Sequence, residues 1–353
     1  MQTNSSVTNS VRTLALWALI LVLVMVVLYA FISGDRDPGT TLSIFATRFL
    51  GIFIEAAPFL LLGSFVSGLL EVYVSREDIV RWVPRNPIAA TITGAFMGFA
   101  FPVCECGVVP VTRRLFTKGL PMSVGVAFLL AAPVMNPVVL VSTYIAFGWG
   151  PVLIARFVLT AVVAIAVGVV FALAARPQEV LRPVSLAPVG GGSGSTPSQL
   201  KKSPSQLQPQ EAQKLTLVQG LYAALRVGSD EFFEMGRFLV IGTMLAAAMQ
   251  TLVSQEVLLR LGEGPFVSVI VMQALAFVLS VCSTVDAFLA LAFVGTFTGG
   301  SIVAFLTFGP MIDIKSTLMF MGVFRRKTVL YLIVLPFLIT LLAGLWMNLF
   351  VTF

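Results

Sequence analysis

The sequence predicts an all-α integral membrane protein in which apolar helices are joined by short polar loops. The chain has 353 residues, of which 58% are hydrophobic and only 11% are charged. Soluble domains carry about 25% charged residues, so a water-soluble fold could not bury this much apolar surface. The formal net charge of +6 arises from lysines and arginines that lie between apolar runs. That distribution is typical of membrane topology, and we expect no nucleic-acid partner.

Nine apolar runs are candidates for membrane segments. The first, Leu14–Ile32, exceeds the roughly 7–15 residues of a signal-peptide core, so it is predicted to remain as an extra N-terminal helix. The other eight runs cover residues 42–73, 88–111, 120–147, 151–175, 217–253, 265–295, 299–324 and 328–352.

A polar stretch divides the chain into two halves of similar size. Residues 176–214 contain a Gly-Gly-Gly-Ser-Gly-Ser run, several prolines and several glutamines, which predicts a flexible linker. The expected division is therefore an N-terminal helix and loop (1–41), a first repeat (42–175), the linker (176–214) and a second repeat (215–353).

The two halves resemble each other at a spacing of 177 to 179 residues. Three patterns recur: Glu55-x-x-x-Phe59-Leu60-x-x-Gly63 as Glu234-x-x-x-Phe238-Leu239-x-x-Gly242, Val103-Cys104 as Val281-Cys282, and Pro133-Val-Met-Asn136 as Pro310-Met-Ile-Asp313. Chance similarity between apolar helices is the alternative. A nearly constant spacing favours an internal repeat, which is frequent in transporters.

The positive charges indicate how these repeats are oriented. If all nine runs crossed the membrane, the loop charges would be spread evenly over both sides. If 88–111 and 265–295 are instead re-entrant hairpins, all of the loop lysines and arginines except Arg36 and Arg260 share one side with the linker. The positive-inside rule favours this second arrangement and places the linker in the cytoplasm. Each half then crosses three times, so the repeats are inverted, and a binding site is expected where they meet.

The tip of the first hairpin carries unusual chemistry for a membrane segment. It reads Pro102-Val-Cys104-Glu105-Cys106-Gly107-Val-Val-Pro110, and its prolines and glycine predict irregular backbone. A carboxylate between two thiols is costly in lipid, which favours a substrate-contacting role. The alternative is a simple kink that contains small buried cysteines.

The tip of the second hairpin reads Ser280-Val-Cys282-Ser283-Thr284-Val-Asp286. Its hydroxyls could instead bond back to helix carbonyls, although Asp286 fits that interpretation poorly. All three cysteines of the chain therefore lie at two repeat-related tips. If the tips meet, three soft sulfur ligands converge.

Two further membrane segments are predicted to be broken helices. Ala132-Pro133-Val-Met135-Asn136-Pro137 interrupts 120–147, and Gly309-Pro310-Met-Ile-Asp313-Ile-Lys315 interrupts 299–324. Broken helices expose ends that bind ions and polar groups. Asp313 and Lys315 either neutralise each other structurally or take part in coupling. Glu55, Glu231, Glu234 and Arg237 also lie in or beside apolar segments, and a structural role is expected for them, with Arg237 pairing to Glu234 or Glu231.

Several activities are excluded by what the sequence lacks. It contains no histidine, so no serine–histidine or cysteine–histidine catalytic arrangement can form. It also contains no phosphate-binding loop of the Gly-x-x-x-x-Gly-Lys-Ser/Thr type. We therefore expect neither an enzyme nor a cofactor.

The first tip and the two Pro-containing breaks resemble the predicted permease family that includes ArsP and YraQ. The resemblance covers about residues 42–350 without the linker. It implies export of trivalent organoarsenicals through a cysteine-containing motif. Glu105 departs from that pattern, because the arsenical exporters carry serine at this position.

The sequence thus predicts a multi-pass permease of the plasma (inner) membrane that moves a small solute by alternating access. The expected cargo is an exported thiophilic metalloid or organoarsenical, and proton coupling is expected. Its partners are the substrate and the bilayer, with a homo-oligomer left open. The alternative is a membrane thiol–disulfide oxidoreductase.

The substrate-binding candidates are Cys104, Glu105, Cys106, Asn136, Cys282, Ser283 and Thr284, with the three cysteines as ligands of a metalloid substrate only. The ion-coupling candidates are Glu105, Asp286, Asp313 and Lys315.

Overall fold

The computed structural model describes residues 38–84, 86–99, 104–174, 217–252 and 264–351. These residues are mostly α-helical, and within them no strand forms beyond an isolated bridge between Val294 and Phe297. The all-α prediction is confirmed. The expected helix at Leu14–Ile32 and the linker at 176–214 lie outside the described residues.

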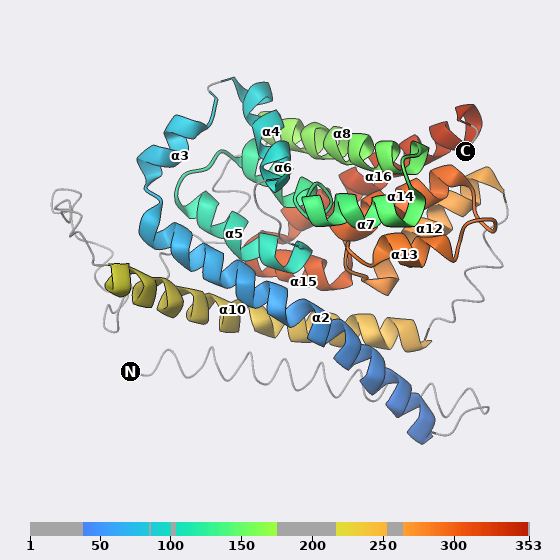
Figure 1. The fold of residues 1–353 in the computed structure, drawn as a ribbon, viewed down its shortest axis with the longest axis horizontal. Helices are drawn as coiled ribbons and strands as arrows, with labels where there is room; N and C mark the ends of the chain where they lie inside the picture. The colour runs from blue at the N-terminus through green and yellow to red at the C-terminus, as the bar shows by residue number, and fades with distance from the viewer. Residues whose placement is uncertain (1–37, 85, 100–103, 175–216, 253–263, 352–353) are drawn as a thin grey trace.

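Two helices of 36 residues each, α2 (Pro38–Tyr73) and α10 (Leu217–Leu252), pack against each other along one side of the molecule (Figure 1). At about 1.5 Å per residue each is about 54 Å long, which exceeds the roughly 30 Å hydrocarbon core. Glycines let their backbones approach closely. A Cβ on Gly228 would lie 2.8 Å from the carbonyl oxygen of Ser64, and one on Gly68 would overlap the carbonyl of Ala224. Small residues at such contacts are typical of membrane helix pairs.

Within the described part of the chain, five helical stretches are long and apolar enough to cross a bilayer. They are Gly39–Tyr73, Pro151–Leu173, Val218–Thr251, Gly299–Val323 and Arg326–Phe350. Shorter apolar helices cover Pro87–Phe99, Met122–Ala131, Pro137–Phe147 and Pro265–Leu279. Leu61, Ile154 and Leu342 are exposed on long helices, where contact with lipid suits them. The membrane prediction is confirmed.

Both expected helix breaks are present. In the first half, α6 (Met122–Ala131) ends before α7 (Pro137–Phe147), and the Asn136 side chain accepts a 2.9 Å hydrogen bond from the N–H of Val139. In the second half, α14 (Gly299–Met311) ends before α15 (Ile314–Val323), and Asp313 accepts a 2.6 Å bond from the N–H of Ser316. Each side chain satisfies an N–H group that the start of a helix leaves unpaired.

The segments expected as hairpins also contain broken helices. The first contains α4 (Pro87–Phe96), a 3-10 turn η1 (Met97–Phe99) and α5 (Glu105–Thr117). The second contains α12 (Pro265–Leu279), turns at 280–285 and α13 (Asp286–Leu291). Ser280 has a φ of 49°, the left-handed region, and is the one non-glycine residue with positive φ in the described ranges.

The course of α5 corrects two predictions. The prolines and glycine predict irregular backbone up to Pro110, and residues 113–118 fall in the expected loop between the runs 88–111 and 120–147, but the helix runs unbroken from Glu105 to Thr117. Pro110 cannot donate a backbone hydrogen bond within this helix, and the packing of α5 against other helices compensates for that loss. A Cβ on Gly63 of α2 would overlap the backbone of Gly107, so α5 is pressed against α2 at this point.

The helix order of the first half recurs in the second. After α2 and α10, α6 and α14 begin at residues 122 and 299, and α7 and α15 begin at 137 and 314. Each half ends in a long helix, α8 (Pro151–Ala174) and α16 (Arg326–Phe350). The short α3 (Arg76–Trp82) follows α2 and has no counterpart among the described residues.

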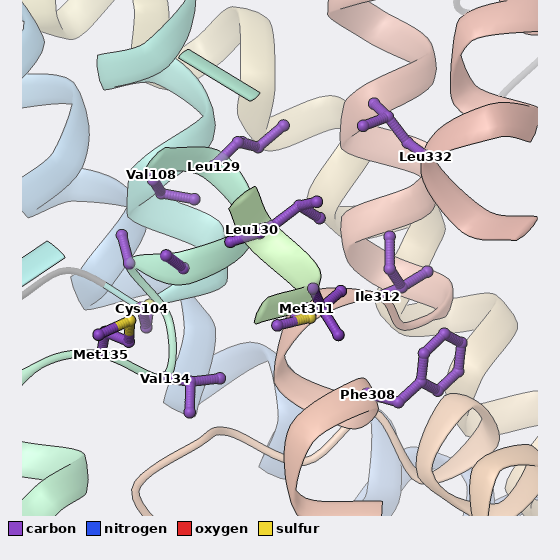
Figure 2. Close-up of a cluster of buried hydrophobic side chains, with 14 of the residues drawn as sticks. Cys104, Val108, Leu129, Leu130, Val134, Met135, Phe308, Met311, Ile312 and Leu332 are labelled. Carbon is purple, nitrogen blue, oxygen red and sulfur yellow. The ribbon is translucent and has the colours of Figure 1, made fainter. Parts of the chain in front are cut away.

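The halves share one buried apolar cluster (Figure 2). Its labelled side chains include Cys104, Val134 and Met135 from the first half, and Met311 and Ile312 from the second. The cluster includes residues of both helix breaks. Irregular backbone at membrane depth is tolerated where it faces protein in this way.

Candidate functional site

The three cysteines lie together where the two halves meet. Cys104 is the N-cap residue of α5, Cys106 lies in the first turn of that helix, and Cys282 lies in the turn before α13. The thiol of Cys104 lies close enough to interact with the thiols of both Cys106 and Cys282. All three are buried and free of disulfides. The structure thus brings together cysteines that are 178 residues apart in sequence.

The thiol contacts run from Cys106 through Cys104 to Cys282. In the part of the chain that the structure describes, no three or more cysteine, aspartate or glutamate groups are already arranged to hold a metal ion. Cys104 can therefore bind a ligand together with either Cys106 or Cys282. Binding by all three sulfurs requires Cys106 and Cys282 to approach each other.

Lys315 forms a second, fully buried cluster beside these thiols. Its Nζ lies 3.0 Å from Oε1 of Glu105 and 3.1 Å from Oδ2 of Asp313, and it donates a 2.6 Å hydrogen bond to the carbonyl of Ser280. The expected Asp313–Lys315 pair is therefore present, and Glu105 extends it. The charge of this ammonium also acts on Cys106 and Cys282, so the two clusters are electrostatic neighbours.

Three local features place this lysine. Asp313 caps α15 with Oδ1 and keeps Oδ2 for Lys315. Gly242 of α10 makes room for the lysine backbone, since a Cβ there would lie 2.8 Å from the Cα of Lys315. The left-handed backbone of Ser280 ends α12 with its carbonyl facing the ammonium. One cation therefore contacts the tips of both predicted hairpins.

Asp286, the remaining coupling candidate, forms an ion pair with a different cation, Arg156. Nη2 of Arg156, in α8, lies 2.7 Å from Oδ2 of Asp286 and 3.4 Å from the carbonyl oxygen of Ser283. Nη1 of Arg156 donates a 2.8 Å bond to the hydroxyl of Thr143 in α7. Sequence reasoning missed Arg156, although an arginine inside an apolar segment is itself a signal for a functional or paired charge.

The other predicted site residues have local contacts. The Thr284 hydroxyl donates to the sulfur of Cys282 at 3.6 Å. The Ser283 hydroxyl is buried and finds no hydrogen-bond partner among the described residues. Asn136 donates to the carbonyls of Ala132 and Pro133 besides capping α7, which is a structural role.

A separate ionic network holds the C-terminal part of α5 against α2 and α10. Arg113 lies 2.8 Å from Glu234, while Arg114 lies 3.3 Å from Glu71 and 3.4 Å from Glu231. Lys118 donates to the carbonyls of Glu71 and Val74 and so caps the end of α2. The expected Arg237–Glu234 pair is present at 4.0 Å. Arg113 and Arg114 were missed as partners because they had been assigned to a loop.

We expect Arg114→Met to destabilise the protein more than Arg113→Met. Glu231 is fully buried, and once Arg114 is removed the Ser67 hydroxyl is its one remaining hydrogen-bond partner among the described residues. Breaking a buried pair typically costs about 3–5 kcal/mol. Glu234 is 23% exposed and retains Arg237, so the loss of Arg113 should cost about 1 kcal/mol or less. Thermal unfolding of the purified protein in detergent checks this. Equal losses in the two variants, or no recovery on adding Glu231→Gln to Arg114→Met, would contradict it.

Comparison with known proteins assigns the chain to a family. The family ArsP_1, described as a predicted permease, matches residues 41–349. The chain belongs to this family. The ArsP_1 match spans both halves, including the thiols and both buried ion clusters, and it confirms the resemblance drawn from the motifs. It also indicates a transporter.

Three curated proteins are similar to this ArsP_1 chain. UPF0718 protein YcgR of Bacillus subtilis is 42% identical over 298 residues, covering 84% of this chain and 94% of the relative. A putative two-component membrane permease complex subunit of Streptococcus mutans is 35% identical over 284 residues, covering 80% and 87%. UPF0718 protein YraQ of Escherichia coli is 27% identical over 89 residues, covering 25% and 26%. No solved structure gives a significant match.

Proposed function

We propose that this permease exports a small thiophilic solute across the plasma membrane by alternating access, in exchange for protons. The observation that carries the proposal is the meeting of three thiols with the Glu105–Lys315–Asp313 cluster, at helix breaks that both halves contribute. A site between two halves can be opened to each side in turn. The substrate class that suits it best is a trivalent metalloid or an organic derivative of one, because soft sulfur ligands favour soft centres.

The two halves are proposed to be inverted repeats, each with one re-entrant hairpin. Reciprocal contacts support this relation: α5 of the first half packs on α15 of the second, and α13 of the second packs on α7 of the first. The recurring helix starts support it as well. The division into repeats at 42–175 and 215–353 follows from the same arrangement.

Impermeant thiol labelling tests the topology that this proposal requires. In a background with all three cysteines changed to serine, Glu77→Cys and Lys327→Cys should react only after permeabilisation, and Trp149→Cys should react in intact cells. All three positions are exposed, whereas Lys118 is unsuitable because it caps α2. If Trp149→Cys instead reacts from the same side as Glu77→Cys and Lys327→Cys, as it would if all nine runs crossed the membrane, the hairpin arrangement is ruled out.

The lysine cluster is the proposed coupling site. Two carboxylates face one ammonium, so full ionisation leaves an excess negative charge in a buried place, which is unfavourable. Uptake of one proton removes that excess. The Arg156–Asp286 pair is already balanced, so Glu105 and Asp313 are the stronger candidates for carrying the proton.

The rival function, a thiol–disulfide oxidoreductase, is also favoured by one contact. Cys104 touches two other thiols, and oxidation of a pair to a disulfide would release two electrons and two protons to an acceptor such as a quinone. Cycling the protein with a thioredoxin-like donor separates the two functions. In an oxidoreductase two free thiols disappear when the disulfide forms and reappear when the donor reduces it, whereas a permease keeps all three throughout.

The Streptococcus relative is named as a subunit of a two-component complex. We propose that this chain also works in an assembly and that the simplest form is a homo-oligomer. The mass of the purified protein in detergent, measured by light scattering, distinguishes one copy from several.

A further inference from the structure

Three buried polar atoms around the Arg156–Asp286 pair have no hydrogen-bond partner among the described residues. They are Nε of Arg156, Oδ1 of Asp286 and Oγ of Ser283. The three residues are 0%, 2% and 1% exposed, so bulk water does not reach these atoms. They offer an N–H donor, a carboxylate acceptor and a hydroxyl that can act as either.

The ion pair itself leaves these three atoms unused. Arg156 already satisfies Asp286 through Nη2 and Thr143 through Nη1, which is enough to tie α8 to α7 and α13. Leaving a further donor and a further acceptor unpaired in the interior is unfavourable, and each buried polar group ordinarily has a partner. The unpaired atoms are therefore suited to a polar ligand.

One of the three residues adjoins the thiol cluster along the chain. Ser283 follows Cys282 in the turn before α13, and Cys282 contacts Cys104. The charge of Glu105, which lies between the other two cysteines, also acts on Asp286. A ligand held by the thiols could therefore extend a polar substituent toward Arg156.

We propose that Arg156, Asp286 and Ser283 form an oxygen-binding subsite for a substrate that carries a hydroxyl group on its thiophilic centre. The proposal rests on the proposed function, because the thiols must hold that centre. A hydroxyl fits the subsite chemically: its oxygen accepts from Nε–H of Arg156 or from the Ser283 hydroxyl, and its proton is donated to Oδ1 of Asp286. The substrate class is thus a trivalent metalloid hydroxide.

Binding of such a substrate to the thiols involves no change of oxidation state. Each thiol that attacks the metalloid forms one sulfur–metalloid bond, and its proton leaves with the displaced hydroxyl as water. When two thiols react with a trihydroxide, one hydroxyl remains for the subsite. When one thiol reacts with a centre that bears two methyl groups and a single hydroxyl, no oxygen remains.

Equilibrium dialysis of the purified full-length protein tests the subsite, with bound arsenic measured by elemental mass spectrometry. The probes are arsenite, which has three hydroxyls, and dimethylarsinous acid, which has one. Arg156→Lys keeps a cation beside Asp286 but loses the Nε donor, and it should weaken arsenite binding about tenfold; Ser283→Ala should weaken it about threefold. Binding of dimethylarsinous acid should stay within about twofold in both variants. Ser64→Ala is the matched control, since it removes another buried hydroxyl without a described partner, on α2.

Loss of arsenite binding with retention of the dimethyl probe supports the subsite. Equal losses for both probes, or unchanged arsenite binding in both variants, overturns it and leaves Arg156 as a structural tether. If Arg156→Lys fails to fold, Ser283→Ala decides alone. Failure of the proposed function gives a different result: the variant with all three cysteines changed to serine would bind arsenite as well as the wild type, or the wild type would bind neither probe.

Discussion

Cys104→Ser should abolish export of trivalent arsenicals, and its effect should exceed that of any other single cysteine change. Cys104 is the shared neighbour of Cys106 and Cys282, so its loss removes both adjacent thiol pairs at once. Cys106→Ser and Cys282→Ser each leave one pair. Even outer-shell changes at metal sites typically cost about 10–100-fold, so loss of the central sulfur should lower transport by at least that much.

The assay is resistance of a deletion strain at matched membrane expression, measured over a panel of metalloids, organoarsenicals and sulfur oxyanions. Cys→Ala variants are the control for packing, because a cysteine that is only a small buried apolar residue tolerates alanine better than serine. Transport as fast as wild type by the triple cysteine-to-serine variant, for every substrate moved, would end the thiol-ligand hypothesis.

The sequence was sufficient to locate the helix breaks and the cysteines. α6 ends at Ala131, shortly before Pro133, and α14 ends at Met311, one residue after Pro310. Proline removes an N–H donor and clashes with the preceding turn, a local effect that needs no tertiary structure. The convergence of Cys104 with Cys282 was also accessible, because the two cysteines share the nearly constant spacing of the recurring sequence patterns. Local chemistry and internal symmetry together therefore led to the thiol cluster.

The sequence did not indicate which charged residues pair with each other, because these residues do not recur at the repeat spacing. At the repeat spacings, Glu105 corresponds to Ser283, and Lys315 corresponds to Val138. No repeat argument could therefore pair Glu105 with Lys315 or Arg156 with Asp286. These pairs depend on how α5 docks on α15 and how α13 docks beside α7 and α8, which periodicity does not encode. The helix through Pro110 was misjudged for the same reason, since its packing on Gly63 comes from a distant segment.

The second large effect is expected on proton coupling, because only the lysine cluster has more carboxylates than cations. Glu105→Gln should remove the pH dependence of transport while the protein stays folded, because Asp313 and Lys315 remain as a neutral pair. Asp286→Asn, a matched change of one buried carboxyl to its amide, strips the counter-ion from Arg156 and should lower stability by about 3 kcal/mol, yet the pH dependence should persist.

Lys315→Met completes the test, because it leaves Glu105 and Asp313 facing each other without a cation. We expect that variant to lose about 3–5 kcal/mol of stability, and we expect Glu105→Gln added to it to restore part of the loss, since the second change removes one of the uncompensated charges. Arsenical flux into or out of proteoliposomes, measured at several pH values with and without an imposed proton gradient, gives the coupling; thermal unfolding in detergent gives the stability. If Glu105→Gln and Asp313→Asn both keep the wild-type pH profile, or if Asp286→Asn alone flattens it, the lysine cluster is not the coupling site and the Arg156–Asp286 pair takes its place.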